Sequence, residues 1–146
     1  MRSWRRLSRN RPPNSSSSVG ATRTFDHVDQ RVRSLEVAKP FYDGLLREFG
    51  FRGRPHGEGT HVYLRVLERS AHEAFALIED PAHQCNRSCL AFRADSPAEV
   101  DRIAATLPAI GAQAIEGPMP CPEYTESYYA VFFTDPDGNR LEVAFR

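Results

Sequence analysis

The stretch V-F-F-T-D-P-D-G-N-R-L-E-V-A-F, from Val131 to Phe145, decides the fold of this chain. Residues 131–134 are β-branched and aromatic, which is typical of a buried strand. The cluster D-P-D-G-N at residues 135–139 predicts a turn, because proline fixes one backbone dihedral and Gly138 tolerates a positive φ. A strand, a tight turn and a second strand are therefore expected at the end of the chain.

The second half of this stretch alternates between two faces. Leu141, Val143 and Phe145 share one face, and Glu142 and Ala144 share the other. The pattern predicts a closing strand that projects a single carboxylate, Glu142, from its less bulky face. That carboxylate is either a surface partner in an ion pair or part of a site, and the rest of the chain supplies the context.

An earlier stretch predicts a strand followed by a helix. Residues 25–32 (F-D-H-V-D-Q-R-V) have the composition of a strand, and Ser34 is suited to cap a helix. Apolar residues then recur at helical spacing. These are Leu35, Ala38, Tyr42, Leu45, Leu46 and Phe49.

The rest of the first half continues with strands. Pro40 sits inside the helical pattern, so the helix starts or bends there, and Gly50 is expected to end it. A loop at residues 55–59 precedes two expected strands, at 61–66 and 73–78.

The second half of the chain repeats this order. Residues 89–94 (C-L-A-F-R-A) predict a strand, and Ser96-Pro97-Ala98-Glu99 is a capping box with proline at the first helical position. Gly111 closes the helical segment, and residues 112–127 form a proline-rich connection before the final strands.

The spacing of the two halves indicates an internal repeat. The caps Ser34 and Ser96 lie 62 residues apart, as do His27 and Cys89, and the helix-ending glycines lie 61 apart. A β-α-β-β-β unit that occurs twice predicts an α+β fold of two modules, which form a curved, partly open eight-stranded barrel. His27 and Cys89 would occupy equivalent positions on the two first strands.

The domain is expected at residues 24–146, with modules at about 24–80 and 88–146. Residues 1–23 contain six arginines and no acid, so we expect a disordered tail, a transit peptide, or a start codon assigned too early.

The composition of the domain excludes several classes of partner and location. The remainder of the chain has 13 basic and 19 acidic residues, which argues against a nucleic-acid groove. No apolar run is long enough to cross a membrane, and three cysteines without a C-x-x-C pair favour a reducing, cytoplasmic compartment.

These motifs together resemble the vicinal oxygen chelate superfamily, which includes glyoxalase I, bleomycin-resistance proteins and extradiol dioxygenases. The resemblance covers about residues 25–146. It rests on F-D-H-V around His27, S-L-E-V-A-K-P-F-Y from Ser34, L-A-F-R-A from Leu90, and Y-Y-A-V-F-F-T-D-P-D-G-N-R-L-E ending at Glu142. Each motif is weak alone, but four in the right order with the repeat spacing are specific.

The resemblance implies metal ligands on the first and last strand of each module. His27 matches the first ligand and Glu142 the closing carboxylate, whereas Cys89 stands where the family has histidine. The fourth position should fall near Ala74 to Ala76, around Phe75, and none of these can bind a metal.

Three interpretations of this set remain open. His27, Cys89 and Glu142 could hold zinc, which accepts mixed nitrogen, sulfur and oxygen ligands; iron(II) and manganese suit the set poorly. Alternatively, no metal binds, and His27 and Glu142 make hydrogen bonds in a ligand-sequestering cavity. In the third interpretation, Cys89 is a thiolate activated by His27.

Further residues are candidates for substrate binding because of the faces they share. Arg31 lies four residues after His27, and Arg93 four after Cys89, so either could bind an anionic substrate or extend to the rim. His61 begins a strand and could face the cavity. The adjacent Tyr128 and Tyr129 must point to opposite sides of their strand, and one of them could orient a ligand.

We therefore expect a small-molecule enzyme of the glyoxalase or dioxygenase type. In such a lyase, isomerase or dioxygenase, a divalent metal would act on adjacent substrate oxygens, and Glu142 would be a ligand or proton-transfer base. The alternative is a non-catalytic, drug-sequestering protein on the same scaffold. The resemblance also implies a homodimer.

Overall fold

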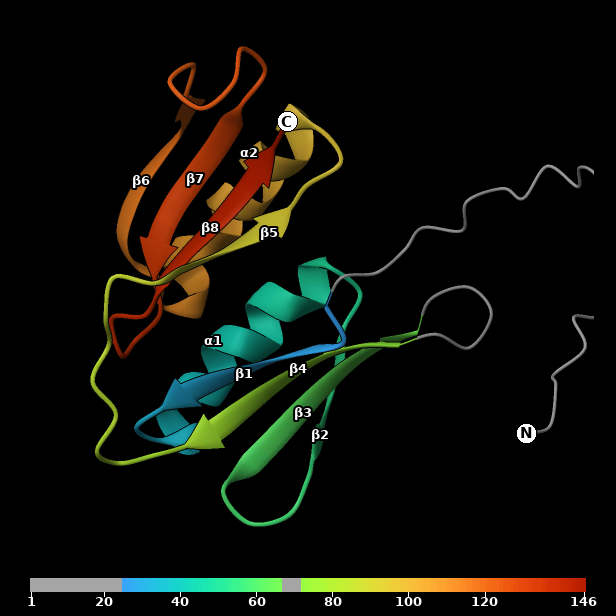
Figure 1. Ribbon diagram of the computed structural model, residues 1–146, viewed down its shortest axis with the longest axis vertical. Coiled ribbons are helices and arrows are strands. Elements are labelled where there is room, and N and C mark those ends of the chain that lie inside the picture. Colours follow the sequence, from blue (N-terminus) through green and yellow to red (C-terminus); the bar gives the residue numbers. More distant parts are fainter. Residues whose placement is uncertain (1–24, 67–71) are drawn as a thin grey trace, which may run out of the picture.

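The computed structural model describes residues 25–66 and 72–146, which form two consecutive β-α-β-β-β modules (Figure 1). The expected tail at residues 1–23 lies outside the described residues. Module one consists of β1 (His27–Val32), α1 (Leu35–Glu48), β2 (Arg52–Pro55), β3 (Thr60–Val66) and β4 (His72–Glu79). Module two consists of β5 (Cys89–Arg93), α2 (Pro97–Thr106), the 3₁₀ helix η2 (Leu107–Ile110), β6 (Gln113–Pro120), β7 (Tyr129–Thr134) and β8 (Arg140–Phe145).

Each module folds into one four-stranded sheet with the same strand order, β1-β4-β3-β2 and β5-β8-β7-β6. The first and last strands of a module pair in parallel, and the other pairs are antiparallel. The two sheets stay open and do not close into one hydrogen-bonded barrel. The predicted α+β fold of two modules is confirmed.

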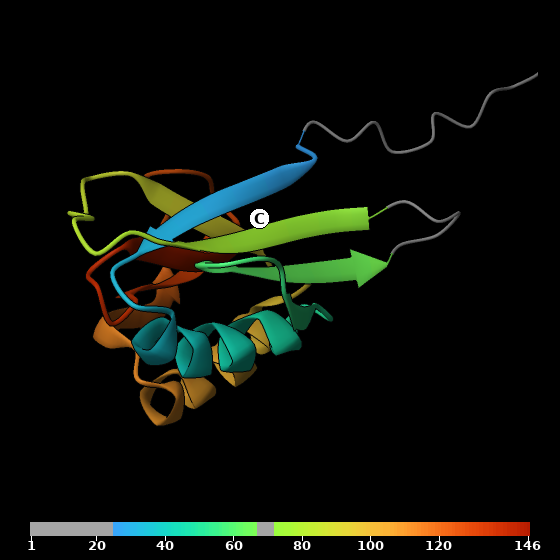
Figure 2. The ribbon, with the colours of Figure 1, turned by 90° about the horizontal axis from the view of Figure 1, so that it is seen from below.

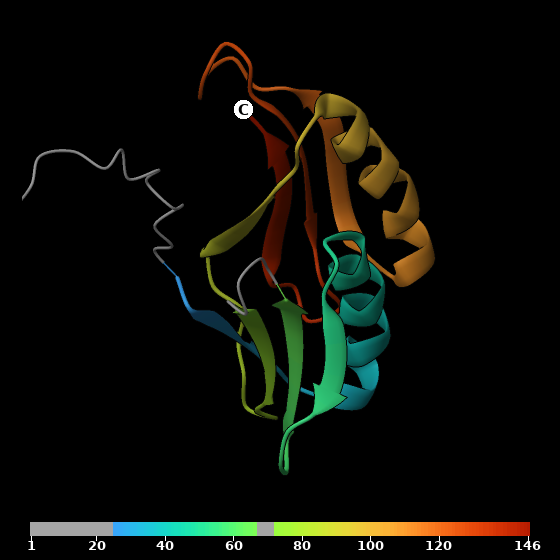
Figure 3. The ribbon, with the colours of Figure 1, turned by 90° about the vertical axis from the view of Figure 1, so that its right-hand side faces the viewer.

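Both helices cover the same face of the two sheets, as Figures 2 and 3 show. The opposite face of the sheets is called the open face below. Along β1, β5 and β8 it carries His27, Asp29, Arg31, Cys89, Ala91, Arg93, Glu142 and Ala144.

Both helices begin at the predicted serines. Ser34 Oγ accepts a hydrogen bond from the Val37 amide at 3.4 Å, and Ser96 Oγ accepts one from the Glu99 amide at 3.1 Å. These bonds satisfy amide groups that have no partner inside the helix. Among the described residues, no helix combines the length and apolar character needed to cross a membrane.

Two details differ from the sequence-based expectation. α1 begins at Leu35 and not at Pro40, which lies inside the helix. The segment expected as a connection, residues 112–127, contains the edge strand β6, whose pairing with β7 includes two register shifts. Proline, glycine and irregular pairing are tolerated at a sheet edge, and this explains why the composition of the strand resembles a loop.

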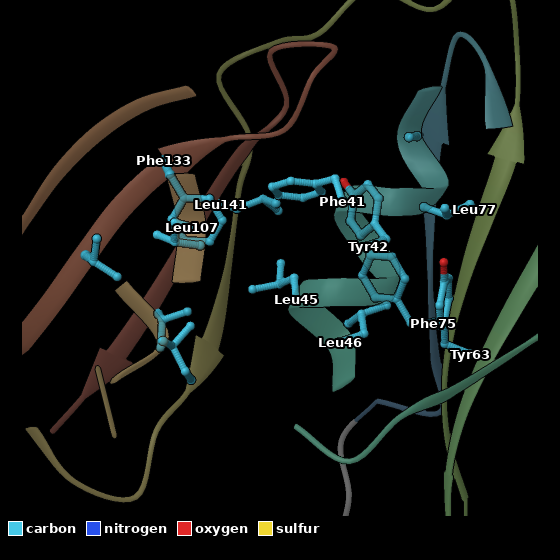
Figure 4. Packing of buried hydrophobic residues seen from close by; sticks show 14 of the residues in the cluster. Phe41, Tyr42, Leu45, Leu46, Tyr63, Phe75, Leu77, Leu107, Phe133 and Leu141 are labelled. Atoms are coloured by element: carbon cyan, nitrogen blue, oxygen red, sulfur yellow. The ribbon is translucent and has the colours of Figure 1, made fainter. Parts of the chain in front are cut away.

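One hydrophobic core joins the two modules. Figure 4 shows α1 between the two sheets: Phe41 points towards Phe133 and Leu141 of module two, whereas Tyr42 lies against Phe75 of module one. The rings of Phe41 and Phe133 have centroids 6.3 Å apart, and those of Tyr42 and Phe75 are 5.5 Å apart. The modules therefore share the apolar surface that each needs to bury.

The turn at residues 135–139 connects the modules through polar groups. Asp135 is fully buried, and its carboxylate accepts hydrogen bonds from the Tyr42 hydroxyl at 2.8 Å and from the Asn139 side chain at 2.8 Å. The same carboxylate accepts the backbone amides of Asp137 and Asn139, both at 2.9 Å. Asp137 in turn accepts from the Arg33 amide at 2.6 Å. A buried carboxylate with four donors is stable in the interior, and here it fixes α1 against the β7–β8 turn.

Candidate functional site

Glu142 lies on the open face of β8, where strand alternation directs it away from the helices. Its neighbours in sequence, Leu141 and Val143, are fully buried in the core on the other face. Across the sheet, Glu142 is in register with Ala91 of β5 and Phe132 of β7. These three side chains therefore share one face.

The Glu142 carboxylate is buried, although it faces away from the core. The residue is 8% exposed, and Tyr128 donates its hydroxyl to Glu142 Oε1 at 2.6 Å. A small apolar cluster built from Cys121, Ala130 and Ala144 lies beside it. Burying a charge is costly unless a hydrogen bond compensates for it, and Tyr128 supplies that bond.

Tyr128 is correspondingly perturbed. Burial, and then the hydrogen bond to the Glu142 carboxylate, raises the pKa of Tyr128 to about 12. The phenol therefore stays protonated at neutral pH and acts as a hydrogen-bond donor. Its neighbour Tyr129 points to the helix side, where its hydroxyl donates to Asp101 of α2 at 2.7 Å. Of the two predicted tyrosines, only Tyr128 lies at Glu142.

Cys89 lies on the same face as Glu142, two residues along β5 from Ala91, the residue that pairs with Glu142. Burial raises the pKa of the Cys89 thiol, the Glu142 carboxylate raises it further, and Arg140 partly offsets this. A raised pKa favours the thiol over the thiolate, which is the nucleophilic form. This environment is therefore unfavourable for the activated thiolate considered from the sequence.

His27 is not joined to Cys89 and Glu142. Its side chain is 57% exposed, and its Nδ1 lies 2.9 Å from Asp26 Oδ1. That hydrogen bond, together with the charges of Asp29 and Asp26, raises the pKa of His27. His27 lines a cavity of about 200 Å³ together with Ala91, which itself pairs with Glu142. Ala91 and its strand β5 thus stand between the histidine and the carboxylate.

The fourth ligand position is occupied by alanine. Asp29 and Ala91 are equivalent by the 62-residue spacing, and their parallel partners are Ala76 and Glu142. Ala76 is therefore the counterpart of Glu142 in module one, whereas Phe75 points into the core. Within the described residues, no group of three or more His, Cys, Asp or Glu side chains is placed to hold a metal ion.

A second cavity of about 200 Å³ lies on the open face beside Glu142. Arg93, Tyr128, Ala144 and Arg146 contribute to its lining. It thus contains two of the residues predicted to bind substrate, Arg93 and Tyr128. Arg31 is also on the open face but is exposed on β1, and it does not line this cavity.

His61 lies on the other side of the molecule. It is in register with Leu77, whose side chain belongs to the core, so His61 faces α1 and not the open face. Its predicted role in ligand binding therefore concerns a different pocket, described below.

The sequence pattern did not reveal the Tyr128–Glu142 pair as a unit. Both residues were separate candidates, but their hydrogen bond depends on Tyr128 preceding β7 and reaching back across the sheet. The available signal was the alternation of side chains along a strand. If residues 129–134 form a strand, Tyr128, Ala130 and Phe132 lie on one face, and Phe132 pairs with Glu142.

Comparisons with known proteins agree with this architecture. Residues 24–143 match the family model described as the glyoxalase/bleomycin resistance protein/dioxygenase superfamily. An uncharacterised protein of Bacillus subtilis, YqjT, is 27% identical over 125 residues, which are 80% of this chain and 94% of that protein.

Two solved structures are similar in fold. A glyoxalase/bleomycin resistance protein from Albidiferax ferrireducens has a TM-score of 0.68 at 30% identity, covering 85% of this chain and 99% of that one. The fosfomycin resistance protein FosX from Listeria monocytogenes has a TM-score of 0.65 at 17% identity, covering 86% and 94%. Another structure of FosX contains Mn(II) and 1S,2S-dihydroxypropylphosphonic acid.

Proposed function

Because the chain belongs to the glyoxalase/bleomycin resistance protein/dioxygenase superfamily, we propose that it binds a small organic molecule on the open face of module two. The observation that carries this proposal is the buried Glu142 carboxylate with its Tyr128 donor at the edge of a cavity. Ligand pockets of proteins combine an apolar lining with a few placed polar groups.

The chemistry in and beside the cavity indicates which ligand groups it would accept. Glu142 lies behind the cavity-lining Tyr128 and uses one oxygen for it, so its remaining lone pairs would accept from an N–H or O–H group of a ligand that reaches past Tyr128. Arg93 and Arg146 line the same cavity and carry permanent positive charges suited to an anionic group. A ligand with both a hydrogen-bond donor and an anionic group fits this arrangement.

The side chains of one chain do not fit the metal centre that the family resemblance implies. Ala76 stands where a carboxylate would be needed, and the 57% exposed His27 is bonded to its neighbour Asp26. We therefore propose ligand binding by hydrogen bonds and charge, as in a sequestering protein, with no step that passes through a metal.

A metal-dependent enzyme is the second candidate. The adjacency of Cys89 and Glu142 favours it, since these two donors lie on one face. A lyase, isomerase or dioxygenase with Glu142 as metal ligand or base would need a further metal ligand. The exposed His27 of a second copy in a homodimer would supply one. This candidate requires a dimer, whereas the first does not.

Thermal melts with two probes test the first proposal. The probes are fosfomycin and bleomycin, each with and without a metal chelator. A ligand at a hundredfold excess over its Kd stabilises the fold by about 2.7 kcal/mol. We expect stabilisation that persists in chelator, is lost in Glu142→Gln, and is retained in Tyr129→Phe, the matched control on the helix side. Stabilisation that needs added metal would favour the second candidate instead.

A further inference from the structure

A separate pocket lies on the helix side of module one, between α1 and the strands β2 and β3. It has a volume of about 230 Å³, and its lining includes Lys39, Asp43 and Arg47 from one stripe of α1. His61 and Tyr63 of β3 face them, and Figure 4 shows Tyr63 on this side, near the core residues of α1. This pocket shares no residue with the cavity beside Glu142.

His61 is the unusual residue of this pocket. It is only 7% exposed, and its Nε2 is buried without a hydrogen-bond partner among the described residues. A buried polar atom that lacks a partner is destabilising, so such atoms are rare and call for an explanation. The ring of His61 packs edge-on against Tyr63, with centroids 4.9 Å apart, and Tyr63 offers it no hydrogen bond.

The backbone of Gly53 in β2 lies directly against this ring. A Cβ at Gly53 would lie 2.6 Å from His61 Nε2 and 2.8 Å from Tyr63 Cε1, which is closer than atoms can approach. Gly53 does not have a positive φ, so backbone conformation does not require glycine at this position. The glycine instead allows β2 to pack closely against the rings of His61 and Tyr63.

The charges around the pocket are predominantly positive. The Asp43 carboxylate is already engaged on both oxygens, with Lys39 Nζ at 2.8 Å and the Tyr63 hydroxyl at 2.8 Å. Arg47, one turn further along α1, makes no ion pair within the described residues, and Arg52 also lines the pocket. Three cationic side chains against one carboxylate leave a charge of +2.

We propose that this pocket binds a dianionic phosphate group, which would accept from the His61 imidazole and pair with Lys39 and Arg47. A dianion matches the +2 charge of the lining, and it supplies the acceptor that the buried imidazole lacks. The inference does not rest on the function proposed above, because the pocket lies on the opposite side of the sheets from Glu142.

Titration of the full chain with inorganic phosphate tests this site. The readouts are the His61 imidazole resonances in NMR spectra and the melting temperature, measured against sodium chloride at equal ionic strength. We expect the His61 resonances to shift and the melting temperature to rise with phosphate. In Arg47→Gln, phosphate should bind roughly tenfold more weakly, because one charge-assisted hydrogen bond is lost.

Matched variants separate this site from general charge effects. Arg54→Gln removes the same charge one residue from Gly53 but outside the pocket lining, so it should leave the phosphate affinity unchanged. His61→Gln, which retains a donor, should bind more tightly than His61→Phe. The proposal is overturned if phosphate leaves the His61 resonances unmoved, if Arg54→Gln weakens binding as much as Arg47→Gln does, or if acetate binds as tightly as phosphate.

Discussion

At the scale of single residues, two hydrogen-bonded carboxylates have different tasks. Asp135 is fully buried and accepts four hydrogen bonds, so it has a structural role in the β7–β8 turn. Glu142 accepts one hydrogen bond from a side chain, that of the cavity-lining Tyr128, so its carboxylate retains unused acceptor positions. The number of donors already bound separates the structural carboxylate from the candidate functional one.

The titration of Tyr128 reports directly on Glu142. The pKa of Tyr128 is raised to about 12, by burial first and then by Glu142. A pKa that is raised only in the folded state means that the protonated phenol favours folding. This contribution to the free energy of unfolding is complete below pH 10.0, the ordinary pKa, and is lost as the pH rises towards 12. Glu142→Gln should move the Tyr128 pKa back towards 10.0. Phenolate absorbance, with Tyr128→Phe subtracted as background, measures this, and an unchanged pKa would show that the two side chains are not coupled.

The buried bond between Tyr42 and Asp135 should contribute much more to stability than an exposed one. Tyr42→Phe removes the 2.8 Å bond to a buried carboxylate, so we expect a loss of about 1.5–3 kcal/mol in the free energy of unfolding. Tyr129→Phe removes a similar bond to Asp101 at the surface and should cost less than about 0.5 kcal/mol. Urea unfolding measures both, and equal losses would contradict the structural role assigned to Asp135.

At the scale of elements, α1 and η2 meet at a glycine. A Cβ at Gly44 would overlap Cγ2 of Ile110 and lie 3.1 Å from its Cβ, so the helix approaches module two more closely than an alanine allows. Position 44 is inside α1, where glycine is otherwise unfavourable. Close packing between modules thus explains a residue that helix propensity argues against.

Gly44→Ala should therefore destabilise the protein, although the same change stabilises most helices by about 1 kcal/mol. We expect a net loss of about 1–3 kcal/mol from overpacking against Ile110. In an Ile110→Ala background, the same substitution should become neutral or stabilising. A double-mutant cycle from urea unfolding gives the coupling energy, and a value near zero would mean that the two residues do not touch.

The elements that the sequence predicted well are those whose pattern is local. The helix caps Ser34 and Ser96 and the alternation of residues 141–145 depend only on near neighbours, and the structure agrees with them. β6 was not predicted, because an edge strand with bulges contains the same prolines and glycines as a loop. The position of His61 was also not predictable, since its face depends on the register of β3 with β4.

The candidate site was predictable only in part, for the same reason. Residue types identified Glu142, and the repeat spacing identified Cys89 as the equivalent of His27. Whether such residues meet depends on how the two sheets are placed. β5 stands between His27 and Glu142, and Ala76 occupies the remaining position, which only the pairing of β1 with β4 defines.

At the scale of the whole molecule, the modules form one structural unit. Phe49 of module one stacks on Phe92 of module two with centroids 5.0 Å apart, and Arg102 of α2 pairs with Glu48 of α1. The Asn139 side chain donates to the backbone carbonyl of Arg31 at 3.1 Å. Neither module can bury its apolar surface without the other.

We therefore expect the two modules to unfold together. In native-state hydrogen exchange, the slowest amides of β4 and of β8 should report the same free energy of opening, because only global unfolding exposes them. Phe133→Ala in module two should lower both values equally, by about 3–5 kcal/mol. A loss confined to β8 would contradict a shared core.

The central claim is that one chain has a ligand cavity beside the Tyr128–Glu142 pair and no metal centre. The most direct test is the metal content of protein purified without added metal. Melts with zinc, manganese, nickel, cobalt and iron(II) accompany it. We predict far less than one equivalent of metal and no stabilisation that depends on His27, with stabilisation gained only in Cys89→His. Near-stoichiometric metal that is lost in both His27→Ala and Glu142→Ala would contradict the claim and establish the metal-dependent enzyme.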